Sequence, residues 1–279
     1  MHEKIIDYYN QCEIDYKLLW GLGRCYALHY GYYDKEHVTH VQAVNNMNRV
    51  LAQRAHVNAA DHVLDAGCGI GGSSVWIAQD FGAKVTGVSV ISRHIQKARE
   101  LADKCGVSDL THFELQNYNR TTFSGESFTV IWAIESVCHA EDKRKFLAEA
   151  WRLLKPGGRL IIADGFLNRV EISARERNHL AKWLDGWAVP NLAHINEFHG
   201  YLEQLGFKNV SFSDETKHVL PSSAKLRIAA IFVYLPGKLM QWLGIRTEVQ
   251  MKNILSAYYQ WSLLRNRVWS YGIFYAEKP

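Results

Sequence analysis

A glycine-rich turn between a predicted strand and a predicted helix constrains the fold of this chain more than any other feature. The segment 62–78 has the sequence HVLDAGCGIGGSSVWIA. Val63 and Leu64 predict a short buried strand, and the apolar residues after the glycines predict a helix. We expect Ser73 or Ser74 to cap this helix. A turn of this kind brings a ligand against the first N–H groups of the helix, because glycines leave no side chains in the way.

Two classes of cofactor bind such turns. Gly67, Gly69 and Gly72 match the G-x-G-x-x-G pattern of dinucleotide sites. However, the carboxylate of Asp65 would repel a pyrophosphate, whereas it would attract the sulfonium and ammonium groups of S-adenosylmethionine. The next predicted strand ends in Ser89, where a dinucleotide site is expected to have an acidic residue for the ribose. The turn therefore favours S-adenosylmethionine, and an NAD-dependent dehydrogenase is the alternative.

Strand and helix patterns alternate after this turn, which predicts a parallel sheet with right-handed crossovers. Further strands are expected at 84–89, 111–115, 128–133, 159–164, 207–213 and 269–276, and helices at 38–56, 92–105 and 143–154. Ligands of such sheets bind at the carboxyl ends of the strands. Polar residues at or just after these ends are therefore candidates for the site.

Two segments carry a family resemblance. VLDAGCGIGG resembles the first motif of class I S-adenosylmethionine-dependent methyltransferases, and LLKPGGRLIIAD resembles their late motif. The pattern is most similar to the group that contains tocopherol and sterol methyltransferases. The resemblance implies an α/β fold with a doubly wound, mostly parallel seven-stranded sheet, an antiparallel last strand and a helical cap. It also implies S-adenosyl-L-methionine as the cofactor and S-adenosyl-L-homocysteine as its product.

The resemblance and the patterns divide the chain into four parts. Residues 1–57 are expected to form a helical segment with a loop that closes over the cofactor, and residues 58–165 the cofactor-binding core. Residues 166–206 form a helical cap segment. Residues 207–279 supply the final strands, with a second helical cap insertion at about 214–268.

Cofactor contacts are expected where the family motifs lie. Asp65 and the backbone of the glycine turn hold the methionine part, while Ser89 and its neighbour face the ribose or adenine. His94 takes the place of a family glutamine in the segment GVSVISRH, and the Asn117 carbonyl can accept from the adenine amino group. The alternative for Asn117 is a turn-forming role. The segment LHYGYYD resembles a family segment that closes over the methionine end. The predicted cofactor residues are Tyr30, Asp65, Gly67, Cys68, Gly69, Gly71, Ser89, Val90, His94, Asn117, Tyr118 and Ile134.

A carboxylate and an imidazole follow the fourth predicted strand. Glu135 and His139 lie in AIESVCHAEDK, which resembles the E-x-x-C-H-A segment of sterol and tocopherol-type enzymes. His139 is the candidate base for an oxygen or nitrogen acceptor. For an alkene carbon, Glu135 and aromatic faces would stabilise a developing cation. A purely structural loop histidine is the alternative. The predicted acceptor-pocket side chains are Trp20, Tyr26, Trp183 and Trp187, joined by Tyr30 as an aromatic face.

Composition narrows the partners and the compartment. A net charge of +4 is too small to suggest nucleic acid. Five cysteines without C-x-x-C spacing argue against a disulfide framework and against zinc, so no metal is expected. The sequence has no signal-like N-terminus and no run of eighteen apolar residues, which predicts a cytoplasmic protein that does not span a membrane. The apolar stretch within 225–246, flanked by Lys and Arg, is core helix, mobile lid or membrane-surface patch.

These features together predict an S-adenosylmethionine-dependent methyltransferase for a small hydrophobic acceptor. The resemblance implies acceptors such as terpenoids, prenylated phenols and sterol-like natural products, and an aromatic pocket under a helical cap would suit them. The sequence leaves open whether the acceptor atom is oxygen, carbon or nitrogen, and it leaves the oligomeric state open. A cofactor-binding protein without catalysis is a further alternative.

Overall fold

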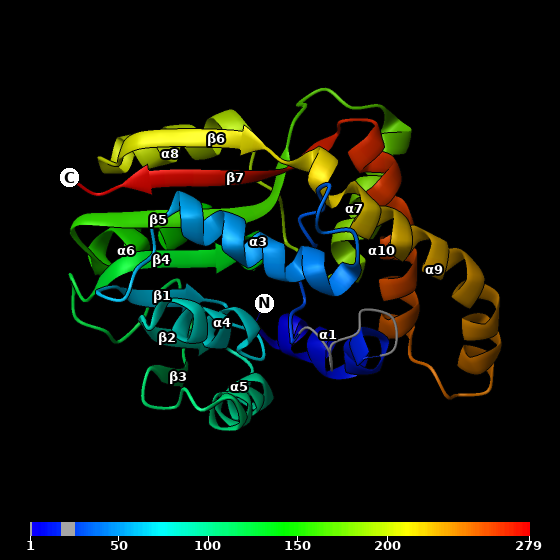
Figure 1. Cartoon of the computed structure of the whole chain (residues 1–279). Coiled ribbons are helices and arrows are strands. Elements are labelled where there is room, and N and C mark those ends of the chain that lie inside the picture. Colours follow the sequence, from blue (N-terminus) through cyan, green and yellow to red (C-terminus); the bar gives the residue numbers. More distant parts are fainter. Residues whose placement is uncertain (1, 18–25) are drawn as a thin grey trace.

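A seven-stranded sheet runs through the centre of the computed structural model, which describes residues 2–17 and 26–279 (Figure 1). Its strand order is β3-β2-β1-β4-β5-β7-β6. The first five strands are parallel, and β7 runs antiparallel to both β5 and β6. This arrangement confirms the predicted fold class. The strands are β1 His62–Ala66, β2 Lys84–Ser89, β3 Thr111–Leu115, β4 Phe128–Ile134, β5 Leu154–Leu167, β6 Lys208–Asp214 and β7 Trp269–Glu277.

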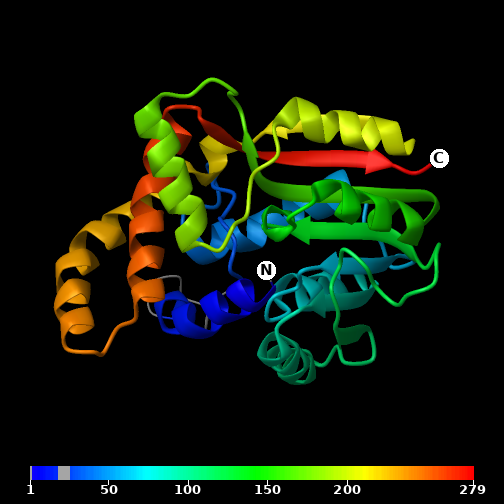
Figure 2. The same ribbon diagram turned by 180° about the vertical axis from the view of Figure 1, so that it is seen from behind.

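Helices cover both faces of the sheet (Figures 1 and 2). One face carries α3 (His40–Arg54), α4 (Gly72–Phe81) and α5 (Ser92–Cys105), and the other carries α6 (Lys143–Leu153) and α8 (Ile195–Leu205). Side chains of a strand alternate between the two faces. In β4, Val130 and Trp132 therefore belong to one apolar core, while Ile131 and Ala133 belong to the other. This two-sided burial explains why the strand is apolar apart from Thr129.

A group of helices lies beyond the carboxyl ends of the parallel strands (Figure 1). It consists of α1 (His2–Asp15), α7 (Ala174–Gly186), α9 (Thr216–Trp242) and α10 (Glu248–Arg265). α1, α7 and α9 come from chain segments that are far apart in the sequence. The space between them is therefore enclosed only when these segments pack together. By length and composition α9 is apolar enough to cross a membrane. The sequence has no unbroken apolar run in this helix, because lysines, an arginine and serines interrupt it. Its membrane-like length and composition were therefore not predicted.

Two local predictions are wrong. No side chain caps α4: its N-cap is Gly71, with φ +85°, and the Ser74 hydroxyl instead donates to Asp65 Oδ2 at 2.5 Å. The segment 155–158, which separates the predicted helix 143–154 from the predicted strand 159–164, lies inside β5. It bulges there, because β4 pairs first with Leu154 and next with Arg159.

Candidate active site

Two cavities meet beyond the carboxyl ends of the strands. The strand-edge cavity measures about 950 Å³ together with its opening to solvent and lies against β1, β2 and the loop after β4. The cap cavity measures about 1030 Å³, also together with its opening, and lies beneath α7, α9 and α10. The residues that line both cavities are Tyr9, Leu28, Glu135 and His139. We call this place the junction, because two ligands, one in each cavity, would meet there.

The glycine turn forms the floor of the strand-edge cavity. The backbone N–H groups of Gly67 and Cys68 both donate to the carbonyl of Val88, at 3.0 Å, which fixes the turn against the end of β2. Gly67 has φ +96°, and a Cβ there would lie 2.4 Å from Cβ of Ser136. Around Gly69 the nearest atom to such a Cβ is in Leu28, at 4.0 Å. The turn therefore needs glycine at the first position for packing, and it leaves open space at the second.

Asp65 places a carboxyl group beneath this turn. Its side chain is buried, and the Ser74 hydroxyl donates to it at 2.5 Å. Burial raises the pKa of Asp65 to about 6. A buried carboxylate is costly unless a cation or several donors accompany it. A cationic group in the strand-edge cavity would supply that partner, which suits a ligand with an ammonium and a sulfonium.

His29 offers a second buried group to the same cavity. Its Nδ1 lies 2.8 Å from the carbonyl oxygen of Tyr30, so Nδ1 carries the proton and donates. The other nitrogen, Nε2, is buried and has no hydrogen-bond partner among the residues that the structure describes. Burial lowers the pKa of His29 to about 4, so the ring is neutral at pH 7 and Nε2 can accept. A donor on a bound ligand would satisfy it.

The aromatic segment 28–34 therefore contributes His29, which the sequence did not predict as a site residue. Tyr30 was assigned to the cofactor, but its ring lines the cap cavity and its hydroxyl donates to Gln260 Oε1 at 2.9 Å. Tyr26 was assigned to the acceptor, but it lines the strand-edge cavity. The cause is that the chain passes from one cavity to the other at Leu28, which lines both.

The structure brings most of the other predicted cofactor residues together. Lining the strand-edge cavity are Asp65, Gly67, Cys68, Gly69, Ser89, Val90, His94, Asn117, Tyr118 and Ile134. Gly71 lies outside the lining, at the N-cap of α4. The Asn117 side-chain carbonyl accepts from the N–H of Asn119 at 2.9 Å, which is the turn-forming role. Ile5 and Tyr9 of α1 also line this cavity and were not predicted.

Aromatic side chains form the walls of the cap cavity. Trp183 and Trp187, both predicted, line it together with Trp269 and Tyr271. Trp183 lies against Trp269 with ring centroids 4.6 Å apart. The predicted Trp20 lies outside the described residues. The walls thus offer apolar faces to a flat or branched hydrophobic ligand.

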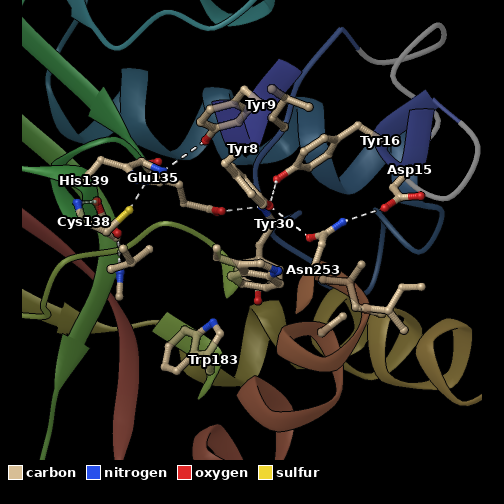
Figure 3. A pocket seen from close by; sticks show the side chains of 18 of the residues that line it. Tyr8, Tyr9, Asp15, Tyr16, Tyr30, Glu135, Cys138, His139, Trp183 and Asn253 are labelled. Atoms are coloured by element: carbon tan, nitrogen blue, oxygen red, sulfur yellow. Dashed lines mark hydrogen bonds between the residues drawn. The ribbon is translucent and has the colours of Figure 1, made fainter. Parts of the chain in front are cut away.

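A hydrogen-bonded chain of polar groups runs along one side of the cap cavity (Figure 3). Tyr8 donates to Asn253 Oδ1 at 3.0 Å, and because it has one hydroxyl hydrogen, Tyr16 must donate to Tyr8, at 2.7 Å. Asn253 donates in turn to Asp15, which Arg246 also contacts at 2.6 and 2.8 Å. Arg246 therefore neutralises the carboxylate of Asp15. On this side the cavity is lined by the phenol groups of Tyr8 and Tyr16 and by the amide of Asn253.

Glu135 lies at the junction in a strained conformation. Its φ of +46° is unusual for a residue with a side chain. The carboxyl group has one loop partner and one strand partner: Oε1 accepts from the Tyr30 N–H at 2.7 Å and from the Tyr271 hydroxyl at 3.0 Å. Burial raises the pKa of Glu135 to about 8, with a further contribution from the charge of Asp164. At neutral pH this carboxyl group is mostly protonated.

His139 faces Glu135 from the 3-10 turn η2 (Val137–His139). Its Nδ1 lies 3.2 Å from the carbonyl oxygen of Ala188, so Nδ1 donates and Nε2 accepts. Nε2 lies 3.1 Å from the Tyr9 hydroxyl, which therefore donates to it (Figure 3). Burial lowers the pKa of His139 to about 4. The predicted pair is adjacent in space, yet each member has its own partners, and Tyr9 comes from the other end of the chain.

Comparison with known proteins gives consistent matches. A family model described as a methyltransferase domain matches residues 64–162. The 27-O-demethylrifamycin SV methyltransferase of Amycolatopsis mediterranei is 30% identical over 211 residues, which are 74% of this chain and 74% of that protein. The 2-methyl-6-phytyl-1,4-hydroquinone methyltransferase of Synechocystis is 36% identical over 166 residues, which are 57% of this chain and 51% of the relative.

A solved structure has the same fold over the whole length. It is a geranyl diphosphate methyltransferase in complex with geranyl diphosphate and sinefungin, with a TM-score of 0.79 and 20% identity, covering 100% of this chain and 99% of that one. These matches support a methyltransferase over both alternatives, the NAD-dependent dehydrogenase and the protein without catalysis. They confirm S-adenosylmethionine as the cofactor, which the buried Asp65 and His29 also fit. The chain belongs to the class I S-adenosylmethionine-dependent methyltransferases, in the group that acts on small molecules.

Proposed function

We propose that the enzyme methylates a hydroxyl oxygen of an uncharged, lipophilic acceptor bound in the cap cavity. The observation that carries this proposal is the orientation of His139 at the junction. Its Nε2 lone pair is held there by the hydrogen bond from Nδ1 to Ala188, and the Tyr9 hydroxyl donates to it. A neutral imidazole with a fixed tautomer is suited to take a proton from a hydroxyl group.

The lining of the cap cavity supports an acceptor without negative charge. Among the described residues that line it, Asp15, Glu135 and Asp164 are acidic and none is Lys or Arg. The described part of the chain also has no cluster of three side chains that could hold a metal ion. A diphosphate would therefore find no Lys or Arg on the lining to neutralise its charge, which is unfavourable in a buried site. Geranyl diphosphate, the ligand of the neighbouring structure, is not the acceptor that this cavity favours.

The residues of the strand-edge cavity would hold the cofactor. Bound S-adenosylmethionine supplies a methyl group activated by the adjacent positive sulfur. We assign Asp65 and the Nε2 atom of His29 to its ammonium group, because one is a buried carboxyl group and the other a buried acceptor without a partner. The glycine turn leaves room for its body, and Asn117 can accept from its adenine amino group.

A proton leaves the acceptor through Tyr9 and His139 in this proposal. The Tyr9 hydroxyl donates to Nε2, so its oxygen can accept from an acceptor hydroxyl at the junction. One concerted shift then moves the acceptor's proton to Tyr9 and that of Tyr9 to His139. The Ala188 carbonyl stabilises the imidazolium that forms, because it already accepts from Nδ1. The aromatic walls align the acceptor and exclude water, which is the larger part of the rate enhancement for a displacement of this kind.

Methylation at carbon is a second candidate, favoured by the aromatic walls. A phenol deprotonated by the same Tyr9–His139 pair is nucleophilic at oxygen and at its ring carbons. The alkene route is less favourable, because Glu135, with a pKa of about 8, carries little charge at neutral pH to stabilise a cation. We therefore place phenols first among the acceptors and simple alkenes last.

A pH profile of methyl transfer tests the proposal. Purified enzyme would be given labelled S-adenosylmethionine with uncharged prenylated phenols or with geranyl diphosphate, and the products would be identified. We expect methylated phenols and a rate that falls only as the pH approaches about 4, the pKa of His139. A rate that falls below a pH of about 8 would assign the base to Glu135 instead. Turnover of geranyl diphosphate alone would refute the uncharged acceptor.

We also propose a reducing compartment, the cytoplasm, and no nucleic acid partner. The four cysteines that the structure describes, Cys12, Cys68, Cys105 and Cys138, are all free thiols. The small net charge of +4 gives little attraction to a polyanion. Fractionation of the source cells, with the enzyme detected by antibody, would test the compartment.

A further inference from the structure

An apolar stripe covers the outer side of α9. Its side chains are Ile228, Ile231, Phe232, Leu235, Leu239 and Trp242, and they are between 52% and 81% exposed. They recur every three or four residues, which places them along one side of the helix. This helix lies farthest from the sheet in both views (Figures 1 and 2). A contiguous exposed apolar surface of this kind marks an interaction site in a water-soluble fold.

The opposite side of α9 is held by the protein. Ala230 packs with Met251 and Ile254 of α10, and Leu226 and Val233 lie beside them. The same inner residues line the cap cavity. Although α9 has the length and composition of a membrane-crossing helix, it could cross a bilayer only by leaving α10 and opening that cavity. The geometry instead fits a helix that lies in the plane of a membrane surface.

Charge on α9 matches an anionic surface. The helix carries Lys217, Lys225, Arg227 and Lys238 and has no Asp or Glu. Lys225 and Lys238 are exposed beside the stripe, whereas Arg227 lies 3.8 Å from the ring of Trp261 and is engaged by α10. Lysines beside an apolar stripe reach lipid phosphates with their ammonium groups while their stems follow the apolar surface.

The same charges disfavour a second copy of this chain as the occupant. In a twofold contact through the stripe the two α9 helices would run antiparallel, centred near Phe232. That contact would bring Lys225 of one copy towards Lys238 of the other, and α9 has no acidic residue to compensate.

We propose that α9 docks in the plane of an anionic phospholipid bilayer, with its apolar stripe inserted among the headgroups. Insertion to about 5–10 Å is usual for such helices. The inner side of α9 would then form a wall between the membrane and the cap cavity, through Leu226, Ala230 and Val233. A lipophilic acceptor dissolved in the bilayer would enter the cavity along this helix without crossing water. The docking itself does not depend on which atom of the acceptor is methylated.

Vesicle flotation tests the docking without acceptor or cofactor. The full-length enzyme would be mixed with vesicles of phosphatidylcholine alone, or with about one quarter phosphatidylglycerol, a proportion that gives a negative surface. The stripe variant carries Phe232→Ser, Leu235→Ser and Trp242→Ser. A charge variant carries Lys225→Glu and Lys238→Glu. The matched control carries Leu115→Ser and Val170→Ser, two apolar residues elsewhere that are also exposed, by 57% and 80%.

We expect the wild type and the control to float with anionic vesicles, and the stripe variant to lose at least about tenfold in partition. The charge variant should lose the preference for anionic over neutral vesicles. Calorimetry with S-adenosylmethionine checks that each variant is folded. Failure of the wild type to float, or equal flotation of the stripe variant, would overturn the proposal. So would a wild-type dimer in light scattering that the stripe variant dissociates, since a second copy would then cover the stripe.

Discussion

The carboxylate of Glu13 on α1 accepts from Nζ of Lys97 on α5 at 2.5 Å. Arg93 contacts the same carboxylate at 2.5 Å, also from α5. Asp15, two residues along, is bound by Arg246 in the loop that leads into α10. One short helix is thereby tied to the cofactor half on one side and to the cap on the other. Since Ile5 and Tyr9 of α1 line the strand-edge cavity, these ion pairs hold a wall of the cofactor site.

The change Glu13→Gln should therefore loosen α1. We expect faster hydrogen exchange in residues 2–17 and weaker binding of S-adenosylmethionine, with the thermal unfolding of the sheet little changed. Burial would raise the pKa of Glu13, but the contacts of Lys17, Lys97 and Arg93 hold it at about 2, so its contribution is present above the usual 4.5 and is lost as the pH falls towards 2. Glu3→Gln, on the same helix but exposed, is the control. Equal hydrogen exchange in both variants would show that the ion pairs of Glu13 do not hold α1 in place.

The cofactor site predicts a second pair of variants. Asp65→Asn removes a charge beside the ligand's ammonium, and loss of a hydrogen bond to a charged group costs about 1.5–3 kcal/mol, or roughly ten- to more than a hundredfold in affinity. His29→Phe removes the unsatisfied Nε2 acceptor and should weaken binding by a smaller factor. Calorimetry with S-adenosylmethionine measures both. His56→Phe, on the surface, is the control, and an unchanged affinity of the His29 variant would remove that residue from the site.

The sequence predicted the strands and the cofactor turn well, because both depend on short-range patterns. A mostly apolar run such as 128–133 is typical of a strand that is buried on both sides, and the glycines after Leu64 are typical of a turn. Even there the local prediction was incomplete: Ser74 matched the pattern of a helix cap but turns instead to the buried Asp65. A hydroxyl can cap a helix or donate to a carboxyl group. Which of these it does depends on whether the helix end or the carboxyl group is farther from water, and the sequence does not show this.

The junction was predicted only in part, because it is assembled from distant segments. Glu135 and His139 could be found from their motif, but Tyr9 lies 130 residues before His139. The one available signal was the spacing of Tyr9 and Tyr16, seven residues apart, which puts both rings on one face of a helix. No local pattern shows that this face covers the two cavities. For the same reason the sequence did not show that Tyr30 lines the cap cavity and Tyr26 the strand-edge cavity.

The proton relay predicts a third set of variants. His139→Gln should lower the rate of methyl transfer by roughly 10²–10⁴, the usual contribution of one acid–base group. Tyr9→Phe keeps the ring but removes the relaying hydroxyl, so it should slow the same step by a similar or smaller factor. The double variant should be no slower than His139→Gln, because both residues act on one proton. Single-turnover rates at saturating cofactor give the comparison, and additive losses would show that Tyr9 acts elsewhere.

The last prediction concerns Glu135 and the stability of the fold. Burial raises its pKa from the usual 4.5 to about 8. Between these values the folded protein keeps a proton that the unfolded chain has lost, so stability falls as the pH rises from 4.5 to 8. Glu135→Gln cannot lose this proton. It also keeps the oxygen that accepts from Tyr30 and Tyr271, because both hydrogen bonds end on Oε1.

The midpoint of thermal unfolding should therefore match the wild type near pH 4.5 and exceed it increasingly towards pH 8, the window set by the raised pKa of Glu135. Each kcal/mol retained raises the midpoint by about 2–4 °C in a chain of this size. Glu126→Gln is the matched control, since Glu126 also has a positive φ, +56°, but is exposed. The measurement is calorimetry of both variants and the wild type without ligand across this pH range. If the Glu135 and Glu126 variants follow the same curve, Glu135 is ionised in the folded protein, and the argument that places phenols ahead of alkenes as acceptors loses its basis.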